Sequence, residues 1–175
     1  MRMLFEETQK NPPIYALGAL APGTLIVFGV FGYGIYQQIG LGKPWGDKPM
    51  SDDALIFVPI FLILVMISVY ILITHINLKT IINRDGIDFR HWPNSKKWMH
   101  ISKTEIISWE MVNYKAIREF GGHGAMKRKK KESYTIRGTS GLHLKLHSGR
   151  ELLIGTQRSE AMRLAMSRLM NPESL

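Results

Sequence analysis

The sequence predicts a two-helix membrane hairpin joined to a small β-rich domain that ends in one helix. Three observations indicate this fold class: charge is divided unevenly along the 175 residues, two stretches stay apolar for the length of a membrane span, and the pattern then changes to alternation. Residues 1–76 carry four Lys or Arg and five Asp or Glu, which leaves 19 basic and 9 acidic residues for 77–175. We therefore place a domain boundary at 76/77, with an N-terminal segment and the hairpin before it.

The two apolar stretches are each long enough to cross a bilayer. No charged residue occurs between Lys10 and Lys43, nor between Asp53 and His75. About 20 apolar residues cross the hydrocarbon core as a helix, and a helix of a small soluble domain would carry a polar face over that length. We expect spans at about 15–38 and 54–76. Neither span holds Asp, Glu, Lys or Arg, which argues against an ion pathway within this chain alone.

Glycine is frequent in the first span, and this predicts a surface for close helix packing. Small residues let helix backbones approach each other in lipid. The candidate packing positions are Gly18, Gly23, Gly29 and Gly32. The alternative is that they reflect only the higher frequency of glycine in membrane helices.

Flanking charges predict the orientation of the hairpin. The loop between the spans has two Lys and three Asp, whereas five basic residues follow the second span: Lys79, Arg84, Arg90, Lys96 and Lys97. Basic residues are enriched on the cytoplasmic side of membrane helices. We therefore expect both termini in the cytoplasm, with only the short loop outside.

After residue 77 the pattern becomes that of strands and one final helix. Alternation and turn residues predict about seven strands, at 78–82, 87–92, 97–101, 105–114, 133–136, 142–147 and 151–154. In residues 159–170, apolar side chains at Met162, Ala165, Met166 and Leu169 form a helical stripe, with Ser159 as the expected N-cap. We expect this helix to close one end of a barrel-like or sandwich-like sheet.

Several segments give the chain a family resemblance over roughly 78–169. They include NRDGIDFR at 83–90, REFGG at 118–122 and LIGTQR at 153–158. With two preceding spans, they resemble bacterial membrane proteins that carry a pleckstrin-homology-like (bPH) domain. The resemblance implies a bent seven-stranded sheet with a C-terminal helix, a location in the bacterial inner membrane and a tendency to form homo-oligomers. It implies no catalytic residue, since such proteins generally lack an assigned activity.

The densest charge cluster is the basic run, defined as Lys127, Arg128, Lys129, Lys130 and Lys131. A flexible basic loop beside the cytoplasmic leaflet would contact anionic lipid headgroups. The alternative is a solvated hairpin that aids solubility. Nucleic acid is disfavoured because no aromatic residue is interleaved with the bases. The first hairpin lacks the basic spacing by which some eukaryotic PH domains bind inositol phosphates.

Metal, cofactor and enzymatic chemistry find little support in the sequence. The chain has no cysteine, so it has no disulfide, thiolate nucleophile or Cys-ligated metal. His143 and His147 lie four apart, but in the predicted strand they share the outer face with Lys145, which disfavours a cation site. No nucleophile elbow or phosphate-binding glycine loop occurs. We expect no enzymatic activity, cofactor or metal.

Two functional hypotheses follow. The first is an inner-membrane-anchored binding or scaffold module that engages a protein partner or itself, with anionic-lipid contact through the basic run. The second is an accessory subunit of a larger membrane complex, packed through the glycine-rich first span.

The tryptophans of the second half, Trp92, Trp98 and Trp109, fit either of two locations: packing on a strand face or the membrane interface.

Overall fold

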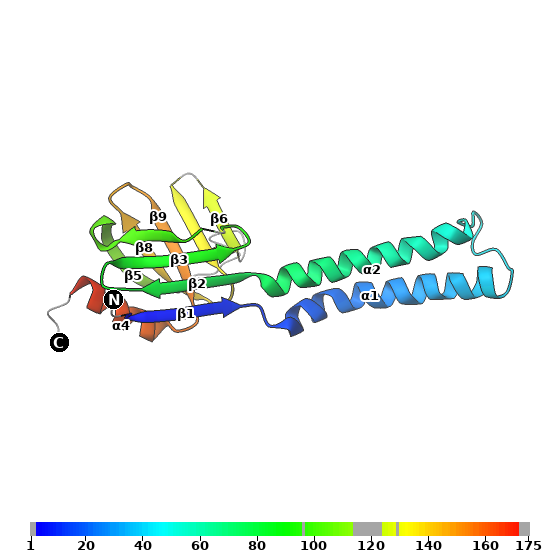
Figure 1. Cartoon of the computed structure of the whole chain (residues 1–175), viewed down its shortest axis with the longest axis horizontal. Helices are drawn as coiled ribbons and strands as arrows, with labels where there is room; N and C mark the ends of the chain where they lie inside the picture. The colour runs from blue at the N-terminus through cyan, green and yellow to red at the C-terminus, as the bar shows by residue number, and fades with distance from the viewer. Residues whose placement is uncertain (1–2, 96, 114–123, 129, 172–175) are drawn as a thin grey trace. The chain divides into compact units, whose positions relative to one another are not determined.

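The computed structural model describes residues 3–95, 97–113, 124–128 and 130–171 (Figure 1). The chain forms two compact units, one of Pro12–Thr74 and one that combines Met1–Asn11 with His75–Leu175. This division differs from the expected boundary at 76/77 because the N-terminal segment belongs to the β-rich unit rather than to the hairpin.

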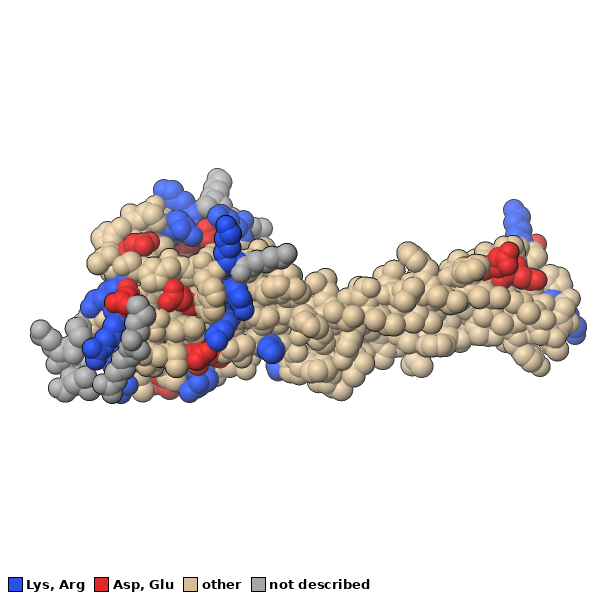
Figure 2. Space-filling model, viewed as in Figure 1, with Lys and Arg blue, Asp and Glu red and all other residues tan. Residues whose placement is uncertain are grey.

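The helical unit has two helices long and apolar enough to cross a membrane, as predicted. Helix α1, Pro13–Ile35, continues through a π-helical turn, Tyr36–Gly40, and α2 spans Asp52–His75. Few of their residues are buried. Gln38 ties the connecting loop to the start of α2, since its Nε2 donates to the Met50 carbonyl at 2.8 Å and to Asp52 Oδ1 at 2.7 Å. Figure 2 shows these helices as almost free of charge except near the loop.

The β-rich unit contains two sheets and a C-terminal helix, which confirms its predicted β-rich character. Sheet A has the order β1-β2-β3-β4, and its strands are Phe5–Lys10, Asn77–Ile82, Gly86–Trp92 and Met99–Ser102. A 3-10 turn, Lys103–Glu105, leads into sheet B. Sheet B has the order β5-β8-β9-β7-β6. Its strands β5 to β9 are Ile106–Asn113, Gly124–Arg128, Lys131–Thr135, Ser140–Leu146 and Glu151–Thr156, and helix α4 is Ser159–Met170.

Nine strands are therefore described where about seven were predicted. The seven expected strands correspond to β2, β3, β4, β5, β7, β8 and β9, with small differences at their ends. Strands β1 and β6 were missed. Neither has a plain apolar alternation: β1 has the sequence FEETQK, and β6 begins at a glycine and ends in Lys127 and Arg128.

The core lies between the two sheets and α4. Leu142, Leu144 and Leu146 of β8 point into it, as the alternation predicted, and the α4 stripe at positions 162, 165, 166 and 169 is buried. The N-cap of α4 is Arg158 rather than the expected Ser159. The Arg158 amide donates to Thr156 Oγ1 at 3.0 Å, so a hydroxyl two residues earlier in the chain accepts this hydrogen bond.

Strand β1 is fixed to the β-rich unit by buried polar contacts. Glu7 accepts hydrogen bonds from Thr156 Oγ1 at 2.6 Å and from the Gln157 amide at 2.9 Å. Gln9 Nε2 donates to the Gly155 carbonyl at 2.7 Å. Both side chains are buried, so removing β1 would leave the junction of β9 and α4 with buried groups that have lost their partners.

Candidate functional site

The described residues of the basic run belong to a β-hairpin of β6 and β7, where the sequence predicted a loop. Lys127 and Arg128 end β6, Lys131 begins β7, and Lys127 lies opposite Glu132 in the antiparallel register. Lys130 lies in the turn and is exposed. Lys129 and the side chain of Arg128 lie outside the described residues, as do residues 114–123 with their REFGG segment.

Two lysines of the basic run are held by carboxylates. Lys127 Nζ lies 3.2 Å from Glu132 Oε1, and Lys131 Nζ lies 3.3 Å from Glu151 Oε2. Both lysine side chains remain about 70% exposed. The basic run therefore has less free positive charge than its sequence suggests, although Lys127, Lys130 and Lys131 still face solvent.

Glu132 is the buried centre of this hairpin. Its side chain is 4% exposed and also pairs with Arg150, whose Nη2 lies 3.0 Å from Oε2. Burial acts to raise the pKa of Glu132, but hydrogen bonds and charges from Arg150 and Lys127 outweigh it and hold the pKa below its ordinary value. The Tyr134 hydroxyl donates to the same carboxylate at 3.2 Å. Burial first, and then the Glu132 charge, raise the pKa of Tyr134 to about 12.

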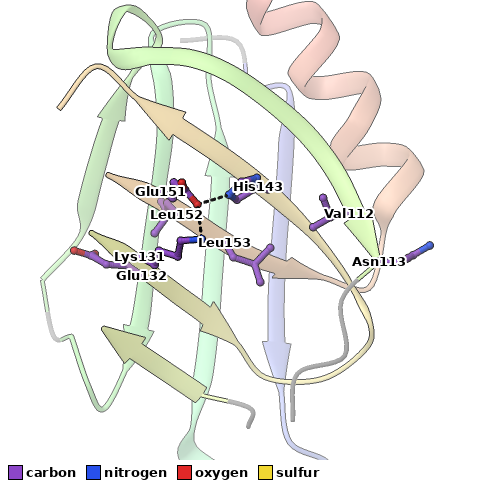
Figure 3. Close-up of a pocket in the computed structure, with 8 residues that line it drawn as sticks. All are labelled: Val112, Asn113, Lys131, Glu132, His143, Glu151, Leu152 and Leu153. Atoms are coloured by element: carbon purple, nitrogen blue, oxygen red, sulfur yellow. Dashed lines mark ion pairs between the residues drawn. The ribbon is translucent and has the colours of Figure 1, made fainter. Parts of the chain in front are cut away.

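A groove of about 310 Å³ lies on sheet B, next to the basic run. It is lined by residues from four neighbouring strands: Val112, Asn113, Lys131, Glu132, His143, Glu151, Leu152 and Leu153. Figure 3 shows His143 and Lys131 directed toward the Glu151 carboxylate. The groove thus combines a polar centre with aliphatic side chains.

A row of charged groups runs through this groove and ends at Glu110, which contacts His143 but does not line the groove. His143 Nδ1 lies 3.0 Å from Glu110 Oε1, and its Nε2 lies 3.4 Å from Glu151 Oε2. The hydrogen bond from Lys131, followed by its charge and by His143, holds the pKa of Glu151 below its ordinary value. The row Glu110–His143–Glu151–Lys131 therefore joins β5, β8, β9 and β7. Such a fixed pattern offers a partner both donors and acceptors at set positions.

Sequence reasoning placed His143 on the correct face but missed its partners. The strand alternation put His143 opposite the core. Its contacts with Glu110 and Glu151 depend on how β5 and β9 pair with β8, and no local pattern shows that register. In the described part of the chain, no group of three or more His, Cys, Asp or Glu side chains is arranged to hold a metal ion.

The glycines of α1 divide between two faces of the helix. A Cβ added at Gly23 would lie 2.9 Å from Met66 Cε on α2, so this predicted packing position lies against the second helix. Gly18, Gly29 and Gly32 have no atom within 4 Å of such a Cβ. Gly34, which was not among the candidates, packs closely on the Trp45 ring.

Comparison with protein-family models gives no match for this chain, and comparison with curated proteins gives none either. The resemblance to bPH-domain membrane proteins therefore stays a hypothesis.

Proposed function

We propose that the chain is a non-enzymatic, membrane-anchored binding module. In this proposal the two apolar helices span a bacterial inner membrane, and the β-rich unit is a PH-like domain on the cytoplasmic side. The groove of sheet B and the basic run form the surface that receives a protein partner or a second copy of the chain. The observation that carries the proposal is the polar row across four strands, of which His143, Glu151 and Lys131 line the groove.

The architecture supports this assignment in two ways. Two sheets around one core with a C-terminal helix are compatible with the PH-like interpretation. The helices also keep large apolar side chains exposed along their length, including Leu25, Phe57 and Phe61. Exposed apolar surface of this extent needs an apolar surrounding, which the hydrocarbon of a bilayer supplies.

Lipid contact through the basic run remains a prediction, since Lys127 and Lys131 already have carboxylate partners. The carboxylates of an acidic segment in a protein partner would pair with these lysines as well as a lipid headgroup would. We therefore assign the groove and the hairpin together to protein binding in this proposal.

A photo-cross-linking experiment tests this assignment. A benzophenone amino acid at Asn113, in the groove, is compared with one at Leu164, which is 51% exposed on α4. In native membranes the groove position should give one discrete cross-linked product, and His143→Ala with Lys131→Ala should reduce its yield severalfold. Equal products from both positions, or no change on mutation, would contradict the assignment.

A second candidate function is that of an accessory subunit in a larger membrane complex. The observation that favours it is the face of α1 at Gly18, Gly29 and Gly32, where nothing within the hairpin approaches the helix. Small residues of this kind let a foreign helix pack closely. Purification in mild detergent separates the two candidate functions. A membrane protein that co-purifies in stoichiometric amount, and is lost on Gly29→Leu, would support the accessory-subunit function. A homo-oligomer without a companion would support the binding-module function.

A further inference from the structure

One end of sheet A is tied by the chain to both apolar helices. Strand β1 ends at Lys10 and α1 begins at Pro13, while α2 ends at His75 and β2 begins at Asn77. Lys10 pairs in register with Asn77, and Asn77 pairs with Trp92. Figure 1 shows β1 and β2 side by side, with the chain entering α1 and returning from α2 at the same end of this pair. Any bilayer that contains the helices therefore lies within a few residues of this row.

The face of sheet A opposite the core changes its charge along the strands. The row nearest the helices carries Lys10 and Trp92, and the next row carries Thr8, Lys79 and Arg90. Carboxylates come only in the third row, which carries Glu6 and Asp88. The core-facing residues of the same strands are the alternate ones, such as Leu78 and Phe89. Positive charge and aromatic rings are thus concentrated at the end of the sheet that adjoins the helices.

Aromatic contacts hold this end of the sheet in place. The Arg90 guanidinium carbon lies 5.1 Å from the centre of the Trp98 ring, and that tryptophan is 44% exposed. The rings of His75 and Trp92 lie 6.1 Å apart. Tryptophan is enriched where hydrocarbon meets headgroups, and a guanidinium positioned by a ring is suited to bind phosphate oxygens.

We propose that Lys10, Arg90, Trp92 and Trp98, here called the strand-end patch, bind the phosphate groups of anionic phospholipids at the membrane surface. The proposal rests on the membrane insertion proposed above and assigns lipid contact to this patch in place of the basic run. In the described part of the chain, neither Lys10 nor Arg90 is paired with a carboxylate, whereas Lys127 and Lys131 both are. Lys10 and Arg90 can therefore bind a phosphate without first giving up a carboxylate partner, which Lys127 and Lys131 would have to do.

The test uses the full chain in phosphatidylcholine vesicles that contain some phosphatidylglycerol. Trp45→Phe and Trp109→Phe leave Trp92 and Trp98, both in the patch, as the fluorescent residues. Quenching by brominated phosphatidylglycerol is compared with quenching by brominated phosphatidylcholine, and the ratio gives the lipid preference at the patch. Each base near an anionic surface favours anionic lipid about fivefold, so we expect a clear preference for phosphatidylglycerol that added salt weakens.

Matched variants decide between the two basic surfaces. Lys10→Gln with Arg90→Gln should lower the preference about 25-fold, and Lys10→Gln alone, on an exposed side chain, about fivefold. Lys130→Gln with Lys131→Gln removes the same charge from the basic run and should change it less than about twofold. An unchanged patch variant, or an equal loss in the basic-run variant, would overturn the proposal.

Extraction of the same vesicles at alkaline pH separates this proposal from membrane insertion. A chain released by alkali would overturn both proposals. A chain that stays in the membrane but shows equal quenching by the two lipids would overturn only the strand-end patch.

Discussion

The two units of this chain expose their leucine side chains to very different extents. In the β-rich unit, Leu142, Leu144 and Leu152 are almost fully buried. In the helical unit, Leu25, Leu64 and Leu72 are about half exposed or more. The difference follows from the surroundings that each sequence fits: alternating strands hide an apolar face from water, whereas uniformly apolar helices fit lipid on all sides. Average composition therefore describes neither unit.

The boundary between the units is crossed twice, and this makes the β-rich unit discontinuous in sequence. Strand β1 precedes the hairpin, yet Glu7 and Gln9 are bonded to residues 155–157. The chain therefore cannot be divided at the end of its second helix without removing part of the β-rich unit.

Removing β1 should have the largest effect. A fragment of residues 75–175 should lose cooperative unfolding, because it lacks an edge strand and the buried partners of Gly155 and Thr156. The matched control joins residues 1–11 to 75–175 through a short Gly-Ser linker in place of the helices, which the pairing of Lys10 with Asn77 permits. This control should melt cooperatively by circular dichroism. Equal melting of both fragments would show that β1 is dispensable.

The same substitution in the two units should give very different costs. Leu144→Ala removes a fully buried side chain and should lower the free energy of unfolding by about 2–5 kcal/mol. Leu64→Ala, at a side chain 57% exposed on α2, should change the stability of the reconstituted full chain by less than about 0.5 kcal/mol. Denaturant titration of the full chain in lipid measures both. Similar costs would contradict the contrast between the units.

Glu132→Gln should cost about 2–3 kcal/mol, because Arg150 and Lys127 lose a charged acceptor and the amide leaves buried groups poorly matched. The folded-state pKa of Glu132 is lowered, so its contribution is fully present above the unfolded-state pKa and is lost as pH falls through the folded-state value. The wild type should therefore lose stability below about pH 4–5, and the variant should lose less.

Glu110→Gln is the matched control for the stability cost of Glu132→Gln. Glu110 is 62% exposed and pairs with His143, so its removal should cost no more than about 1 kcal/mol. A loss equal to that of Glu132→Gln would mean that burial does not distinguish the two carboxylates.

Glycine substitutions on the two faces of α1 should give the smallest effects. A Cβ at Gly34 would lie 2.7 Å from the Trp45 ring, so Gly34→Ala should displace the ring at a cost of about 1 kcal/mol. Gly29→Ala meets no neighbour and should leave the hairpin unchanged. The fluorescence of Trp45, with the other tryptophans replaced, reports both. A shift on Gly29→Ala would indicate a partner on that face.

Local patterns predicted the elements whose buried face is apolar. The helices, the strands β2 to β5, β8 and β9, and the stripe of α4 all follow from period and length. Strand β7 was also predicted, as 133–136, although its buried residues are Glu132, Ser133 and Thr135. Strand β1 was not predicted because its buried face carries Glu7 and Gln9, whose hydrogen-bond partners lie far along the chain.

For the candidate site, the basic run and the face of His143 were visible in the sequence. The carboxylates Glu132 and Glu151, and the groove between them, follow from strand register, which one sequence does not show.

In the proposed topology the helices cross a membrane, and the two segments that flank them join one domain on the same side. The chain has no cysteine, so single cysteines report sidedness without background. In sealed inner-membrane vesicles with the cytoplasmic face outward, Thr8→Cys and Ser148→Cys should react with a membrane-impermeant maleimide, and Ser51→Cys should react only after permeabilisation. Immediate reaction of all three, or reaction of Thr8→Cys and Ser148→Cys from opposite sides, would contradict this topology.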